Sequence, residues 1–268
     1  MAITNNLNFG NPKRPEVYYQ LKEAVAGMGE ACLALGTPVT GGNVSLYNEN
    51  PAGAVYPTPV VGMVGLIDSL AHVTRSHFST DGDSIVLLGN NTDEIGASEY
   101  LQRIHHVVAG APPHCDLAAE RALIDALLQA IQAGVVRSAH DCADGGLAVA
   151  LAECVMMDRA NPTGAHVDLT HWARLPVRAL LFGEAQARVV VSTPDPDAVL
   201  ASAAEHGVPA AIIGTVGAAS GLLSMRIGER QLTVSVAQLA DTYHEAIPRI
   251  MQRSASAQDV ALASDSVV

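Results

Sequence analysis

The segment Thr40-Gly41-Gly42-Asn43-Val44-Ser45 could form a binding site. It contains two adjacent glycines, followed by an asparagine and a serine. Glycines lack a Cβ atom and adopt positive φ, so their backbone N–H groups can approach an anion closely. The amide oxygen of Asn43 suits a hard cation such as Mg²⁺. In an extended chain, the side chain of Ser45 points to the same side as that of Asn43. A phosphate-and-metal rim and a plain turn both explain this segment, because glycine pairs are common in turns.

A second glycine pair precedes an apolar helical pattern that begins at Leu147. Asp144 is predicted to be the N-cap of that helix, and Asp141 lies three residues earlier. Gly145 and Gly146 would leave the N–H donors of the first turn open to a phosphate. Capping explains the acid but not the two glycines, which cost helix stability. A phosphate site and a simple capped helix both remain open here.

Glu184 and Gln186 alternate just before a run of valines that begins at Val189. In an extended chain they would project to one face and could bind a polar ligand. The alternative is a turn in which Arg188 pairs with Glu184. The ten histidines show no metal-binding spacing, and the Walker A and dinucleotide-binding glycine patterns are missing.

These candidate residues must be positioned by helices and strands, whose patterns alternate along the chain. Residues 1–14 have the composition of a polar loop, with at most a short strand at the start. The spacing of apolar residues predicts a helix from Pro15 to Leu35, ended by Gly36, and then a strand over 56–67. Further helices are predicted near 95–106, 116–133, 145–157, 195–206 and 236–251, and further strands near 84–88, 136–139, 187–192, 209–216, 222–227 and 230–236.

The polar stretch 68–82 is the best domain boundary. Residues 1–67 offer one long helix and few strands, which is too little to close a core. This first segment therefore either packs on the second domain or belongs to a larger domain, and the second explanation is favoured.

Composition excludes several classes of function. The chain has 15 Lys plus Arg against 27 Asp plus Glu, a net charge of −12, which argues against sequence-independent nucleic-acid binding. No stretch approaches the roughly 20 apolar residues of a membrane helix, and the N-terminus lacks a secretion signal. The four cysteines form no CxxC pair. We expect a cytoplasmic protein that binds neither nucleic acid nor membranes.

Four segments together resemble one enzyme family: TNNLNFGNPKRPEVYYQLKEAVAGMGEACLALGTPVTGGNVSLYNEN, YPTPVVGMVGLID, HDCADGGLAVALAE and ALLFGEAQARVVVS. They are similar, in order, to the second half of the large subunit of phosphoribosylformylglycinamidine synthase. The resemblance implies an α/β (α+β) fold of the AIR synthetase-like type. It further implies a truncated N-terminal-type domain over residues 1–70 and a complete C-terminal-type domain over 80–250. The Ser-, Ala- and Asp-rich composition of residues 253–268 predicts a flexible tail.

The resemblance also implies a ligase that uses ATP and Mg²⁺ to activate formylglycinamide ribonucleotide, after which glutamine-derived ammonia displaces the phosphate. By position, Gly42 matches an ATP contact, Asn43 a Mg²⁺ ligand and Ser45 a substrate contact. Asn5 stands where the family usually has an ATP-contacting Asp, so a charge is lost there. A secondary nucleotide pocket, often non-catalytic in this family, is expected from Asp141, Asp144, Gly145, Gly146, Glu184 and Gln186.

Nothing in the chain matches the family's catalytic His or its substrate loop. No catalytic residue is therefore assigned, and the chain is expected to be inactive alone. The implied partners are the missing N-terminal half of the synthase, a glutaminase subunit, a small bridging subunit and a small-molecule substrate. The alternative is a non-catalytic nucleotide-binding or assembly module that needs a partner chain. A complete small kinase-like enzyme is disfavoured because the acidic Mg²⁺ cluster of such enzymes is missing.

Overall fold

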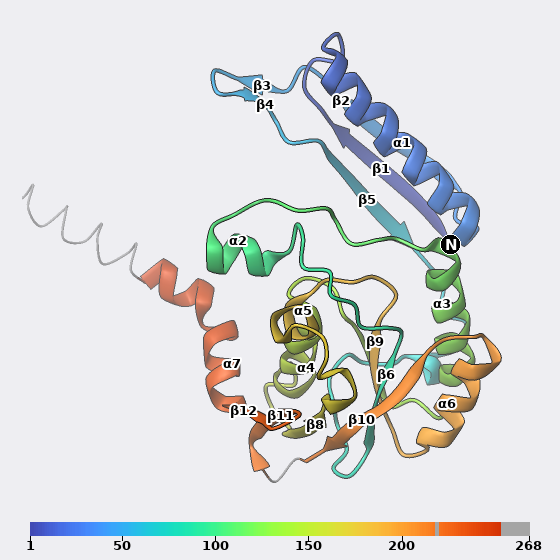
Figure 1. The fold of residues 1–268 in the computed structure, drawn as a ribbon. Helices are drawn as coiled ribbons and strands as arrows, with labels where there is room; N and C mark the ends of the chain where they lie inside the picture. The colour runs from blue at the N-terminus through green and yellow to red at the C-terminus, as the bar shows by residue number, and fades with distance from the viewer. Residues whose placement is uncertain (218–219, 253–268) are drawn as a thin grey trace, which may run out of the picture. The chain divides into compact units, whose positions relative to one another are not determined.

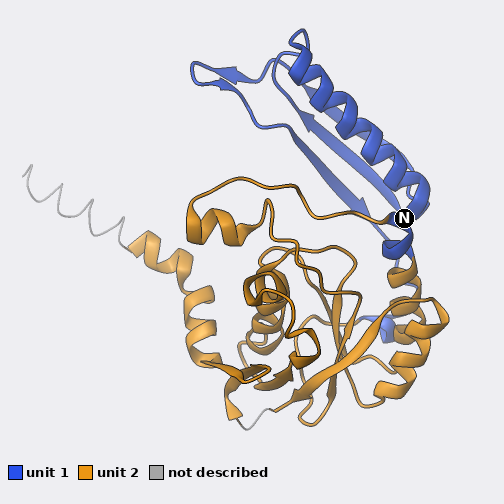
Figure 2. Cartoon of the chain, in the orientation of Figure 1, with its two compact units in different colours: residues 1–73, 117–121 blue, residues 74–116, 122–268 orange. Residues whose placement is uncertain are grey.

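The computed structural model describes residues 1–217 and 220–252 (Figure 1). The chain divides into two compact units, shown in Figure 2. Unit 1 contains residues 1–73 and 117–121, and unit 2 contains residues 74–116 and the described residues from 122 onward. The tail predicted over 253–268 lies outside the described residues.

Unit 1 is built on a three-stranded sheet and one long helix. Strand β1 (Ala2–Asn8) is central, with β2 (Val39–Ser45) parallel on one side and β5 (Thr58–Val64) antiparallel on the other. Helix α1 (Pro15–Leu35) packs on the sheet through a small core of Leu7, Phe9 and Val17. The unit is completed by β3 (Glu49–Asn50), β4 (Gly53–Ala54) and the 3₁₀ helix η1 (Leu70–His72).

Helix α1 confirms the predicted boundaries. Pro15 occupies the first turn, where its missing N–H costs nothing, and Gly36 ends the helix in the left-handed conformation with φ of 66°. Val17 is the fully buried residue of this helix. Large apolar side chains on its surface remain exposed: Tyr18, Tyr19, Val25 and Leu33.

The prediction for residues 1–14 allowed a short strand at the start of a polar loop, but this strand covers residues 2–8 and is the central strand of unit 1. Ile3, Leu7 and Phe9 are buried and are separated by even numbers of residues, which places them on one face of the chain, as the strand period requires. The asparagines between them concealed that pattern, because Asn is uncommon in strands. The strand predicted over 56–67 is confirmed as β5.

Unit 2 contains a seven-stranded sheet with the order β12-β11-β8-β10-β6-β9-β7. Strands β8 and β11 run parallel, and the other neighbouring pairs of described strands run antiparallel. The strands are β6 (Ser84–Leu88), β7 (Ser138–Asp141), β8 (Ala165–Asp168), β9 (Val189–Thr193), β10 (Ala210–Val216), β11 (Leu222–Ile227) and β12 (Arg230–Ser235). The helices are α2 (Glu99–His105), α3 (Leu117–Gln132), α4 (Gly146–Met156), η2 (Thr170–Trp172), α5 (Val177–Phe182), α6 (Pro196–Glu205) and α7 (Val236–His244). The first five residues of α3, 117–121, belong to unit 1.

Strand β6 shows how helices cover both faces of this sheet. Ile85 and Leu87 join the core formed with α4, α5 and α7, whereas Val86 and Leu88 join the core formed with α3 and α6. Alternate side chains point to opposite faces, so all four are buried. The prediction that 84–88 is a strand buried on both faces is confirmed.

Three short elements of unit 2 were not predicted from the sequence: β8, η2 and α5. Segments of four, three and six residues are too short to show a clear period. Across the described part of the chain, every helix falls short of the length or apolar content required to cross a membrane.

Candidate functional site

Asn5 and Gly42, two of the predicted site residues, are direct neighbours in unit 1. They are paired in the parallel ladder between β1 and β2. Gly42 has φ of +152°, and a Cβ atom there would lie 2.0 Å from the carbonyl oxygen of Asn5 and 2.7 Å from its Oδ1. Only glycine tolerates such an approach without a shift of the backbone. The second glycine of the pair is therefore required by its neighbour on β1.

Asn43 and Ser45 lie at alternate positions on β2, as expected, and therefore share one face. The register places Asn6 opposite Asn43 and Asn8 opposite Ser45. Paired residues of adjacent strands project to the same side of the sheet. A row of polar side chains thus crosses the two strands. Sequence reasoning missed Asn6 and Asn8, although their two-residue spacing was the available signal.

The chemistry of this face fits a metal ion that arrives with its own oxygen ligands. Asn43 is exposed and offers a neutral amide oxygen. Within residues 1–217 and 220–252, no group of three or more His, Cys, Asp or Glu residues is arranged to hold a metal ion. Mg²⁺ commonly keeps phosphate and water oxygens and takes only one or two ligands from the protein. The residues therefore fit nucleotide-bound Mg²⁺ better than a cage made by the chain.

The second predicted group lies in unit 2, where Glu184 and Gly145 are in contact. Oε1 of Glu184 accepts hydrogen bonds from the backbone N–H of Gly145 at 2.8 Å and of Glu99 at 2.9 Å. Helix α4 has Gly145 as its N-cap, so the prediction that Asp144 caps this helix is wrong. Asp144 is exposed. A carboxylate of the chain thus accepts the Gly145 donor that was considered for a phosphate.

The glycine pair itself is explained by the local backbone. Gly145 and Gly146 have φ of 79° and 69°, in the left-handed region that favours glycine. A Cβ atom at Gly146 would lie 2.4 Å from the carbonyl oxygen of Gly183, and one at Gly145 would lie 2.5 Å from Cγ2 of Val149. Both glycines allow close packing at the start of α4. This explains why glycine is present there despite its low helix propensity.

Gln186 does not share a strand face with Glu184. Both lie in the loop after α5, because β9 begins at Val189. Gln186 is exposed, and its Nε2 donates to the backbone carbonyl oxygen of Glu184 at 3.2 Å. The expected alternation along an extended chain is therefore wrong.

Arg188 is 3% exposed and binds neutral acceptors rather than Glu184. Its guanidinium donates to the carbonyl oxygens of Ala185 and Gly183, at 3.0 and 2.6 Å, and to Oδ1 of Asn91 at 2.9 Å. Burial lowers the pKa of Arg188. The alternative, a turn in which Arg188 pairs with Glu184, is therefore wrong. Arg188 instead stabilises this loop through buried hydrogen bonds.

Asp141 ends strand β7, and its side chain is 72% exposed. The neighbouring His140 has Nδ1 3.4 Å from Oδ1 of Asp141 and Nε2 3.0 Å from Oε2 of Glu153. The region near the second glycine pair is therefore rich in carboxylates, which would oppose binding of a free anion.

Family models identify the class of protein. The model described as AIR synthase related protein, N-terminal domain, matches residues 1–67, and the model described as AIR synthase related protein, C-terminal domain, matches residues 80–223. The chain belongs to the AIR synthase-related family.

Within that family the chain is similar to phosphoribosylformylglycinamidine synthase subunit PurL. It is 47% identical to PurL of Moorella thermoacetica over 256 residues, covering 94% of this chain and 34% of that subunit. It is 43% identical to PurL of Deinococcus radiodurans over 261 residues, again covering 94% and 34%. The chain therefore spans about a third of the length of the curated relatives it matches.

Solved structures confirm the AIR synthetase-like α/β fold. PurL of Thermotoga maritima complexed with FGAR has a TM-score of 0.70 at 21% identity, over 90% of this chain and 39% of that one. Escherichia coli HypE has a TM-score of 0.61 at 19% identity, over 88% of this chain and 73% of that one. At these identities the likeness shows the fold alone.

Proposed function

We propose that the chain is part of an ATP-dependent C–N ligase, phosphoribosylformylglycinamidine synthase. This enzyme would convert formylglycinamide ribonucleotide, ATP and glutamine-derived ammonia into formylglycinamidine ribonucleotide for purine biosynthesis in the cytoplasm. The observation that carries the proposal is the polar row of Asn43 and Ser45 on β2, paired with Asn6 and Asn8 on β1. PurL subunits as relatives, and Thermotoga maritima PurL complexed with ATP as a structural neighbour, support it.

Each residue has a defined role in this proposal. Gly42, which is exposed on β2, would contact an ATP phosphate, and Asn5 would contribute a neutral hydrogen-bonding contact to ATP. Asn43 would offer Oδ1 to Mg²⁺, and Ser45 would donate its hydroxyl proton to the substrate. Bound Mg²⁺ would neutralise phosphate charge during phosphoryl transfer.

The sheet of unit 1 has an apolar edge that further polypeptide could cover. Strand β5 is an edge strand of its sheet, and exposed edges with apolar side chains invite pairing. The exposed apolar residues on and after this strand are Val60, Val61, Met63, Val64, Leu66 and Ile67. We propose that the missing N-terminal half of the synthase covers this edge and supplies the catalytic groups. A glutaminase and a small bridging subunit belong to the same proposal, which the Thermotoga maritima PurLQS structure among the neighbours supports.

An exchange experiment tests the proposal. Residues 1–268 would be assayed alone with ATP, Mg²⁺, formylglycinamide ribonucleotide and ammonia, and we expect no turnover. The same residues would then replace the segment they match in Moorella thermoacetica PurL, and we expect the chimera to form product. Asn43→Ala in the chimera should lower kcat by about a hundredfold and weaken the response to Mg²⁺.

The exposed Asn90, in unit 2, gives a matched control, because Asn90→Ala removes the same amide without touching β2. Turnover by the isolated chain would overturn the division of the active site. Equal activity of the two chimera variants would overturn the role of Asn43.

The alternative to a secondary nucleotide pocket is a purely structural role for Gly145 and Gly146. Glu184 already accepts the N–H of Gly145, so no free anion is needed there. On this view the secondary pocket serves folding and assembly. ATP added to the 268-residue chain should then leave the backbone amide NMR signals of Gly145 and Gly146 unchanged, and shifts of these signals would instead assign a nucleotide to unit 2.

A further inference from the structure

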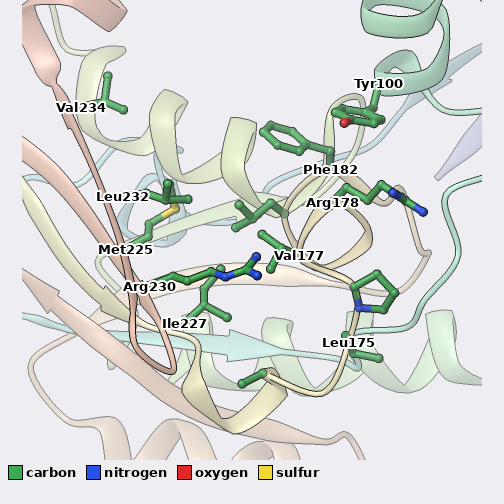
Figure 3. Close-up of a pocket in the computed structure, with 13 residues that line it drawn as sticks. Tyr100, Leu175, Val177, Arg178, Phe182, Met225, Ile227, Arg230, Leu232 and Val234 are labelled. Atoms are coloured by element: carbon green, nitrogen blue, oxygen red, sulfur yellow. The ribbon is translucent and has the colours of Figure 1, made fainter.

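Unit 2 contains a pocket of about 890 Å³ that none of the proposed ligase residues line (Figure 3). It lies between helix α5 on one side and strands β11 and β12 on the other, with Tyr100 of α2 at its edge. Pockets of 300–1,000 Å³ lined mostly by apolar side chains are typical of small-molecule sites. Size and lining therefore both fit a small ligand.

An aromatic wall and a buried apolar floor shape this pocket. Tyr100 and Phe182 are stacked, with ring centroids 5.3 Å apart and planes 15° from parallel. Met225 and Ile227 are buried beneath the opening. Oε1 of Glu184 fixes the start of the Tyr100 helix through the N–H of residue 99. The wall is thus held in place before any ligand binds, which lowers the entropy cost of binding.

Two arginines supply the charge at the pocket. Arg178 comes from α5 and Arg230 from β12, and both are exposed. In the described part of the chain neither has an ion pair, and no acidic residue lines the pocket. Figure 3 shows the guanidinium of Arg230 reaching over the pocket toward Val177. On a chain with a net charge of −12, this is a local site of positive charge.

We propose that the pocket binds a small molecule with a planar aromatic body and one anionic group. The aromatic body would lie against the Tyr100–Phe182 wall and over the apolar floor, where stacking and burial stabilise it. The phosphate, sulfonate or carboxylate group would bind the guanidinium of Arg230. Arginine suits this role because its planar fork donates two parallel hydrogen bonds to such groups. This site is independent of the proposed ligase reaction.

Calorimetric titration of the 268-residue chain with 1-naphthyl phosphate tests the proposal. We expect measurable binding of this probe, binding about tenfold weaker for the neutral 1-naphthol, and none for inorganic phosphate at the same concentration. Arg230→Gln should weaken binding of naphthyl phosphate about tenfold. Arg174→Gln is the matched control, because Arg174 is exposed on the same segment but does not line the pocket.

Methyl NMR of ¹³C-methionine-labelled chain locates the bound probe. The Met225 methyl group lies at the pocket floor and should shift with saturation, whereas that of Met28, in unit 1, should not. Equal weakening by the two arginine substitutions, or equal affinity for naphthol and naphthyl phosphate, would overturn the anion contact. An unchanged Met225 signal at saturation would overturn the site itself.

Discussion

The carbonyl oxygen of Asn5 lies 2.0 Å from where a Cβ atom at Gly42 would be. This approach results from the parallel pairing of β1 and β2, which places the two residues opposite each other. It makes one glycine of the pair structurally obligatory and leaves the other, Gly41, in open space. The two glycines can therefore be separated experimentally.

Gly42→Ala should destabilise unit 1 by about 1–3 kcal/mol, because alanine is strained at positive φ and meets the Asn5 carbonyl. Gly41→Ala is the control, because no atom lies within 4 Å of its added Cβ and its φ is ordinary. Hydrogen–deuterium exchange of the β1 amides should accelerate in the first variant and stay near wild type in the second. Similar exchange in both variants would contradict this assignment.

Glu184→Ala should destabilise unit 2 by about 1–3 kcal/mol, because it leaves two backbone N–H groups at helix starts without their acceptor. Glu184→Gln keeps an acceptor oxygen and should cost less. Urea unfolding followed by the fluorescence of Trp172, the single tryptophan, measures both. Gln186→Ala is the control and should be nearly neutral, since this exposed residue bonds only a neighbouring carbonyl. If Glu184→Ala is as stable as the control, the carboxylate of Glu184 does not stabilise the two helix starts.

Asp168 gives a pH-dependent contribution to stability. Hydrogen bonds from the Thr170 hydroxyl and backbone N–H, followed by Arg226, lower the pKa of Asp168 to about 2. A lowered pKa stabilises the folded state above the unfolded value of about 3.9, and this stability is lost as pH falls toward 2. Because the side chain is 43% exposed, the contribution should stay below about 1 kcal/mol.

Wild type should therefore be more stable than Asp168→Asn at pH 6, and the two should converge between pH 4 and 2.5. Urea midpoints at each pH measure the difference. A difference that does not change with pH would show that the charge of Asp168 is not its source.

The four cysteines should fall into two reactivity classes. Cys115 is exposed and Cys32 partly exposed, whereas Cys142 and Cys154 are buried. Burial raises the pKa of Cys142 to about 11 and that of Cys154 well above its ordinary value. At pH 8 the buried thiols should react with a disulfide reagent about a hundredfold more slowly than Cys115. Rapid reaction of all four thiols in the folded chain would contradict the buried placement.

Several elements could be predicted from local pattern alone. The 3.6-residue period and the flanking Pro15 and Gly36 defined α1, and an uninterrupted apolar run defined β6. Strand β1 was misjudged, because its buried residues alternate with asparagines and its stability comes from two neighbouring strands. Pairing between distant segments leaves little trace in composition.

By itself the sequence determined the family, the α/β class, and the identity of both glycine pairs as special positions. Motif order and residue type are local properties, so a single chain can reveal them. Only the tertiary structure decided what each glycine faces: Asn5 at Gly42, and the Gly183 carbonyl at Gly146. It also decided that Glu184 serves Gly145 rather than Arg188. Such choices depend on which backbones meet after folding, and hydrogen-bonding partners far apart in sequence are fixed only when the sheet and its helices pack.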